Sequence, residues 1–234
     1  MYQTITTDTE FGEVVIQQRE TVRNIIFRVR NGRLHITAPT TATIASIGEL
    51  IEKKRATLRR LFQRGSNNYL RPGDIIHTHD FTIVIETHDS DKYIGRMADN
   101  TLHITLPRHD NYNVDTIQRC IARLAGPFLK HAAERFLPAR LDHWAKILRC
   151  NYRSVSISYG VKRLGVCNSR REIKLSYHLM LLPDRLIDYV ILHELAHLSE
   201  MNHGPKFHEI CNRYCGGNEA ALQKELRLFP FPFR

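Results

Sequence analysis

Apolar and polar positions alternate over short runs in the first hundred residues. Three such runs begin near residues 14, 25 and 34, and a two-residue period is typical of strands with one buried face. Asn31-Gly32 separates the last two runs and is a strong signal for a two-residue hairpin turn. From residue 43 to about residue 63, apolar residues recur three and four positions apart, which predicts an amphipathic helix.

A second set of strand-like runs covers residues 75–76, 81–85 and 102–106. After Asp115 the pattern is helical for about 35 residues, with Pro127 and Pro138 as breaks or kinks. We expect no internal repeat in this arrangement. The prevalence of strands in the first half of the chain is therefore followed by a prevalence of helices.

The remaining residues contain two short strands and several helices. The strands are expected at residues 154–158 and 172–176, with an irregular loop at residues 162–170 between them. The order of elements predicts an α+β fold with a β-rich N-terminal half and a helix-rich C-terminal half. We expect a β-rich region with one long helix at residues 1–108 and a helix-rich region at residues 109–234, either separate or joined in one compact unit.

The most apolar helical segment carries a metal-binding pattern, His193-Glu194-Leu195-Ala196-His197. Residues four apart lie on the same face of a helix, so His193 and His197 can bind one metal ion. Glu194 lies about 100° around the helix from the first histidine, where its carboxylate can reach a metal-bound water. This arrangement is typical of zinc hydrolases in which the glutamate is the general base.

The apolar neighbours of this motif indicate that the helix is buried. Two histidines and a glutamate in such a helix are costly unless a partner satisfies them, and a metal ion does so. A pair of core histidines that are satisfied without a metal is the alternative interpretation.

A catalytic zinc needs about three protein ligands and one open position. Asn202 and Gly204 favour the end of the helix, and a bend there can bring His203 back to the metal. The alternative third ligands are His208, Glu209 and Glu219. We favour His203 because a spacing of six residues recurs in related zinc motifs, although Glu200 stands where those motifs have glycine.

Other histidines and cysteines have simpler interpretations. We expect His77 and His79, and likewise His131 and His143, to be incidental rather than ligands of a second metal. Cys211 and Cys215 are one helical turn apart and are expected to be buried thiols. The five cysteines are odd in number and form no C-x-x-C pair, which favours a reducing cytoplasm.

Charge and hydropathy limit the possible partners. The net charge of +10, from 34 basic and 24 acidic residues, favours polyanions such as nucleic acid, although part of it fits a solvated helix face around Lys53-Lys54-Arg55. We expect neither a membrane-spanning helix nor a signal peptide, because no apolar run of sufficient length is present. The oligomeric state is left open.

The chain resembles the YgjP-like family of predicted metal-dependent hydrolases, which are related by motif to SprT-like zinc proteases. The resemblance covers nearly the whole chain and is carried by residues 28–30, 38–39, 163–167, 173–175, 193–198 and 202–207. It implies His193, His197 and His203 as metal ligands, Glu194 as the catalytic glutamate, and a zincin-like half behind a β-rich half. The chain departs from the family pattern at Leu164, Val166 and His208.

These observations predict a zinc-dependent hydrolase. A metallopeptidase is the favoured reaction class, with Zn²⁺ as cofactor, Glu194 as general base and a peptide or protein as substrate. Two alternatives follow from the positive charge. One is hydrolysis of a nucleotide phosphoanhydride, and the other is a nucleic-acid-associated protease that is tethered by its basic surface.

Overall fold

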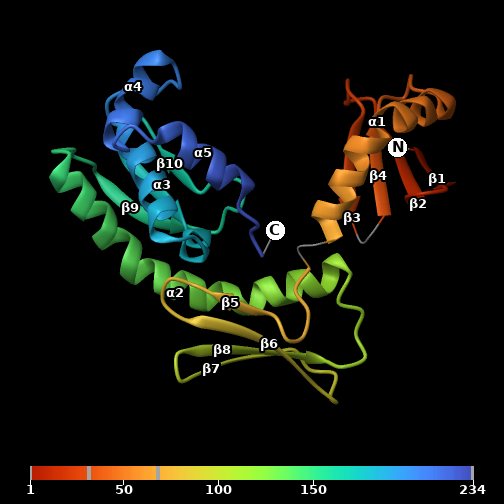
Figure 1. The fold of residues 1–234 in the computed structure, drawn as a ribbon, viewed down its shortest axis with the longest axis horizontal. Helices are drawn as coiled ribbons and strands as arrows, with labels where there is room; N and C mark the ends of the chain where they lie inside the picture. Colours follow the sequence, from red (N-terminus) through yellow and green to blue (C-terminus); the bar gives the residue numbers. More distant parts are fainter. Residues whose placement is uncertain (1, 31–32, 67–68, 233–234) are drawn as a thin grey trace. The chain divides into compact units, whose positions relative to one another are not determined.

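The structure is a computed structural model, and it describes residues 2–30, 33–66 and 69–232. Within this part of the chain, eleven strands form three sheets, and four of the five α-helices begin at or after Asp115 (Figure 1). The predicted α+β class, with a β-rich N-terminal half and a helix-rich C-terminal half, is confirmed.

The first sheet has the strand order β1-β2-β4-β3. Its strands are β1 (Tyr2–Asp8), β2 (Gly12–Gln18), β3 (Ile26–Arg30) and β4 (Arg33–Ala38). The helix predicted near residues 43–63 is confirmed as α1 (Ile44–Ser66), whose Ile47 and Leu58 share a buried cluster with Val14 and Ile36 of the sheet. The predicted Asn31-Gly32 turn lies outside the described residues, although β3 and β4 pair antiparallel on either side of it.

The second sheet has the order β5-β6-β8-β7. Its strands are β5 (Ile75–His77), β6 (Thr82–His88), β7 (Ile94–Ala98) and β8 (Thr101–Pro107). The alternating apolar residues of β6 and β8 are buried, as the two-residue period predicts. The long helix α2 (Asp115–Ile147) follows and contains Pro127 and Pro138, so the helical prediction after Asp115 is confirmed.

The two sheets repeat one topology, so the expectation of no internal repeat is wrong. In each sheet the central pair is parallel and both outer pairs are antiparallel. Ile26 pairs with Thr37 in the first sheet and Ile94 with Thr105 in the second, a displacement of 68 positions on both strands. Residues 34–37 and 102–105 both read Leu-His-Ile-Thr. The chain therefore carries two copies of a four-stranded module, each followed by a long helix.

The third sheet and the last helices form the remainder of the chain. The sheet has the order β10-β11-β9, with β9 (Ser154–Ser158) parallel to β11 (Glu172–Ser176) and β10 (Gly165–Cys167) antiparallel to β11. A 3₁₀ turn, η1 (Tyr177–Leu181), leads into α3 (Asp184–Ala196). The last helices are α4 (Pro205–Tyr214) and α5 (Glu219–Leu228).

The described residues divide into two compact units. The first comprises residues up to Arg71 together with His109–Cys120, and the second comprises Pro72–Arg108 together with Ile121–Pro232. The second unit therefore contains the second sheet, most of α2 and every element from β9 to α5. The division of the chain into residues 1–108 and 109–234 stays a prediction. Among the helices of the described residues, none combines the length and apolar character that a membrane span requires.

Candidate metal centre

Helix α3 carries the first two histidines of the motif and ends earlier than predicted. We expected the helix to stop near Asn202 and Gly204, but it stops at Ala196, with His197 as the capping residue. The backbone N–H groups of Leu198 and Ser199 bond three residues back, to the carbonyls of Leu195 and Ala196. These short-range bonds tighten the last turn, and the chain leaves the helix axis soon enough for His203 to return.

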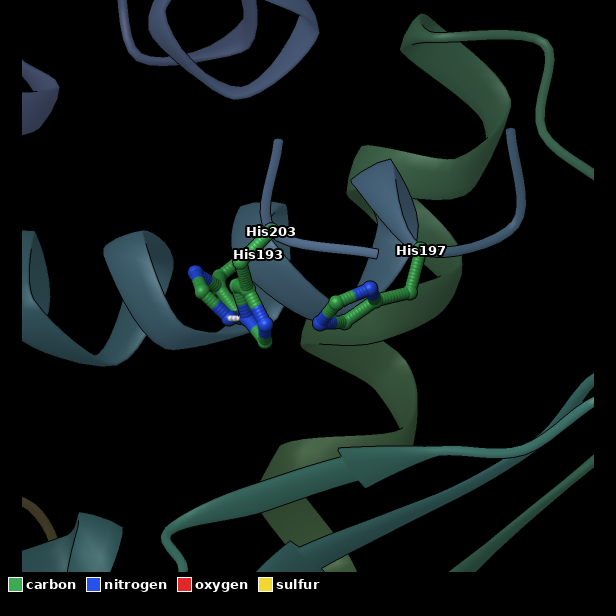
Figure 2. A group of neighbouring side chains, drawn as sticks. All are labelled: His193, His197 and His203. Atoms are coloured by element: carbon green, nitrogen blue, oxygen red, sulfur yellow. Dashed lines mark hydrogen bonds between the residues drawn. The ribbon is translucent and has the colours of Figure 1, made fainter. Parts of the chain in front are cut away.

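The three histidines predicted as ligands come together. One ring nitrogen from each of His193, His197 and His203 lies within 4.8 Å of the others, and Figure 2 shows the rings facing one another. The Nε2 atoms of His193 and His203 are 3.1 Å apart. Two nitrogens on one tetrahedral zinc, with bonds of 2.0–2.1 Å, would be separated by about 3.4 Å. The arrangement therefore fits a zinc ion, and the role of these residues as ligands stays a prediction.

The ring of His197 is held by its backbone neighbour. Its Nδ1 lies 3.1 Å from the carbonyl oxygen of Glu200, to which it can donate a hydrogen bond. With the proton on Nδ1, the lone pair of Nε2 is available to a metal. Such an outer hydrogen bond is the usual way in which a protein orients a metal-binding histidine.

Phe207 of α4 packs against all three rings. Its ring centroid lies 4.8 Å from that of His193, 4.5 Å from that of His197 and 4.7 Å from that of His203. The Phe207 side chain is fully buried. Pro205 begins α4 directly after the turn that contains His203. The start of α4 therefore fixes both the third histidine and the aromatic wall behind the set.

Burial keeps the helical histidines in the form that binds metal. It lowers the pKa of His193 to about 4, with smaller contributions from the charges of His197, His203 and His208. Burial also lowers the pKa of His197. Metal binding requires neutral imidazole, so these side chains need not release protons near neutral pH before a metal enters.

The alternative third ligands lie outside this group. Nδ1 of His208 is 2.7 Å from Oε1 of Glu219, so these two side chains pair with each other. Glu209 is exposed on α4. Among the described residues, the set of three or more potential ligands close enough for one metal is His193, His197 and His203.

The carboxylate of Glu194 is buried beside the histidine-bearing face of α3. The residue is 4% exposed, and burial raises the pKa of its carboxyl to about 8, against the opposing effect of a hydrogen bond from the Cys167 backbone N–H. Within the described residues, Oε2 of Glu194 has no hydrogen-bond partner. A buried oxygen without a partner is costly, and a cationic metal with its water would relieve this cost.

Gly165 of β10 leaves the space that Glu194 occupies. A Cβ atom added to Gly165 would lie 2.4 Å from Oε1, 2.6 Å from Cγ and 2.7 Å from Cδ of Glu194. Any other residue would therefore displace the carboxylate. The sequence analysis did not identify this contact and assigned Gly165 to an irregular loop, which is corrected here because residues 165–167 pair with β11.

One edge of β10 faces away from its sheet, since β10 is the outer strand. The carbonyl of Leu164 accepts a bond from the Ser176 N–H, and the N–H of Asn168 donates to the Glu172 carbonyl. Backbone groups alternate along a strand, so those of Gly165 and Cys167 point to the open edge. Glu194 binds the Cys167 N–H at this edge. The candidate base thus lies beside unpaired strand backbone.

Gly165→Ala is expected to destabilise the fold by about 1–3 kcal/mol, the usual cost of inserting a carbon into a packed site. The cost arises because Glu194 is buried and cannot swing aside. Urea unfolding measures it. Gly48→Ala is the control, because nothing lies within 4 Å of its added Cβ and alanine is favoured in a helix by about 0.5–1 kcal/mol. Equal stability of the two variants would contradict the Gly165 contact.

The other histidines and the cysteines have local partners or remain free thiols. Nδ1 of His79 is 2.9 Å from Asp184 at the start of α3, and its ring packs on Phe136. Cys211 and Cys215 are buried, and all five cysteines are free.

Comparison with known families decides the class of the protein. The family described as YgjP-like, metallopeptidase domain, matches residues 23–227. The chain belongs to this family. No curated protein and no solved structure matches the chain. Membership of the YgjP-like family supports a hydrolase of the metallopeptidase type and implies a metal, and the three histidines of α3 and the following turn could bind it.

Proposed function

We propose that this YgjP-like protein is a zinc-dependent peptidase in which His193, His197 and His203 hold the metal and Glu194 is the general base. The observation that carries the proposal is the convergence of three imidazole nitrogens within 4.8 Å, next to a buried carboxylate with an open oxygen. When bound, zinc supplies a Lewis acid that polarises a carbonyl and lowers the pKa of water to about 7.

Glu194 has the properties that proton transfer requires. Its pKa of about 8 lies near neutral pH, where a group can both accept and release a proton, and the charge of a metal would lower it further. The Cys167 N–H and the close approach of Gly165 hold the carboxylate in place. Glu194 would take the proton of the attacking water and deliver it to the leaving amine.

The open edge of β10 supports a peptide as the substrate. An extended peptide can add to a sheet edge through main-chain hydrogen bonds, and this edge passes directly beside Glu194. The donor set consists of imidazoles, which suit zinc, whereas magnesium prefers carboxylate and phosphate oxygens. This difference favours peptide hydrolysis over hydrolysis of a nucleotide phosphoanhydride.

The compartment and the wider partners extend the same proposal. Five free thiols suit the reducing cytoplasm. The tethering of the protease to nucleic acid by its basic surface stays a prediction.

Metal removal tests the proposed function. The purified protein should contain about one zinc per chain and should cleave a denatured, fluorescently labelled protein. A chelator should abolish cleavage, and one equivalent of zinc should restore it, while magnesium should not. Full cleavage after verified removal of the metal would refute the proposal, and so would the absence of cleavage with zinc bound.

A further inference from the structure

A cavity of about 510 Å³ lies between α2 and the ends of β9 and β11. Gly126, Pro127 and Lys130 line it from the helix, and Tyr159 and Tyr177 line it from the strand ends. The two tyrosine rings meet edge to face, with centroids 5.7 Å apart, and form a continuous wall. Gly126 leaves room beside the Tyr177 hydroxyl, since an added Cβ would lie 3.5 Å from it. The volume is that of a typical ligand site.

Hydrogen-bond donors and cations predominate around this cavity. Arg123 and Lys130 are cationic, and the acidic lining residue, Glu134, is paired with Lys130 at 3.2 Å. The ammonium group of Lys130 also lies 5.4 Å from the centre of the Tyr159 ring. A group that enters this cavity therefore meets excess positive charge and phenol hydroxyls, which favour an anion.

The loop that joins the cavity to β10 adds two further cations. Lys162 and Arg163 lie between Tyr159 and Gly165, and both are exposed. Within the described residues, neither forms an ion pair, whereas Arg140 pairs with Asp188 elsewhere in the same unit. Lys162 and Arg163 are therefore available to an acidic partner.

The cavity is close to the candidate catalytic glutamate. Gly165, which touches Glu194, is opposite Leu175 in the sheet, and Tyr177 follows two residues later. One strand spacing and two extended residues place the Cα atoms of Gly165 and Tyr177 at most about 12 Å apart. An extended peptide covers this distance with about four residues.

We propose that this cavity and the adjoining Lys162 and Arg163 bind acidic side chains of the peptide substrate, about three or four residues from the bond that is cleaved. The inference rests on the proposed peptidase function for the direction of the bound chain. Lys162 and Arg163 would attract the acidic segment, and the tyrosine wall with Lys130 would hold one carboxylate together with its methylene groups.

Binding of a matched pair of peptides tests this proposal without requiring hydrolysis. The full-length zinc-loaded Glu194→Gln protein is titrated into two fluorescein-labelled 12-residue peptides of one sequence, one with four glutamates and the other with glutamines at those positions. The glutamate peptide should bind at least about tenfold more tightly at low ionic strength, because several exposed ion pairs act together. The preference should shrink in about 0.5 M salt.

Two charge reversals in the same Glu194→Gln background locate the binding site. Arg163→Glu should weaken the glutamate peptide about tenfold and leave the glutamine peptide unchanged. Lys224→Glu, an exposed change of equal charge on α5, should leave both affinities unchanged. Equal affinity for the two peptides would overturn the proposal. So would equal losses in both reversals, or displacement of the glutamate peptide by an equal concentration of inorganic phosphate.

The outcomes separate this proposal from the proposed function. Selective binding of the glutamate peptide, without any protein cleavage by the zinc-loaded wild type, would support the acidic site and refute the peptidase. Cleavage without discrimination between the two peptides would refute the acidic site alone. Thermal unfolding of Arg163→Glu at the temperature of its parent would show that the exposed loop substitution leaves the fold intact.

Discussion

Replacing His197 with alanine is expected to abolish stoichiometric zinc binding and to reduce hydrolysis to the background rate. Its Nδ1 is committed to the Glu200 carbonyl, and its Nε2 is the atom available to the metal. Loss of an outer partner of a metal ligand already costs about 10–100-fold in metal affinity or activity, so loss of a ligand itself should cost more. Metal analysis of the dialysed variant measures the effect.

His193→Ala and His203→Ala should behave as His197→Ala does, because the three nitrogens form one group. His208→Ala is the matched control, since His208 pairs with Glu219 rather than with the group. It should retain one zinc per chain. Zinc retention by His203→Ala together with zinc loss by His208→Ala would show that the third ligand had been assigned to the wrong histidine.

Glu194→Gln is expected to keep the zinc and to lose about 100-fold to 10,000-fold in turnover. The amide has nearly the same size as the carboxylate but cannot accept the proton of water, and positioned proton transfer contributes a factor of this order. The Cys167 N–H can still donate to the amide oxygen, so the side chain should stay in place. Turnover and metal content are measured on the same preparation.

A matched variant distinguishes chemistry from packing at this position. Glu200→Gln changes the same functional group a few residues away, on a side chain that lies partly exposed in the turn after α3. It should keep both zinc and most of the turnover. Wild-type turnover in Glu194→Gln would contradict a role for Glu194 in proton transfer.

The parts of the fold that were predictable are those whose signal is local. Helix α1 and the strands of both modules were predictable because their apolar periods match their backbone periods. The pairing of His193 with His197 on one face follows from helix geometry alone. The grouping of His203 with them was also anticipated, because a turn after the helix was expected.

The parts that were not predictable depend on contacts between distant residues. Strand β10 is three residues long and has no apolar period of its own, so it forms only because β11 supplies its backbone partners. The contact of Gly165 with Glu194 joins residues 29 positions apart, and no local pattern marks it. The end of α3 at Ala196 depends on the short-range bonds of Leu198 and Ser199, whereas its sequence continues without a helix-breaking residue to Asn202.

The repeated four-stranded module gives the chain a history as well as a fold. Shared strand order, shared pairing directions and a common register displaced by 68 residues are the marks of a tandem duplication. Only the second copy continues, through its longer helix α2, into the elements that carry the histidines. The ancestral core was therefore one module joined to the metal-binding half, and the N-terminal copy is a later duplicate that could acquire a separate task without cost to the chemistry.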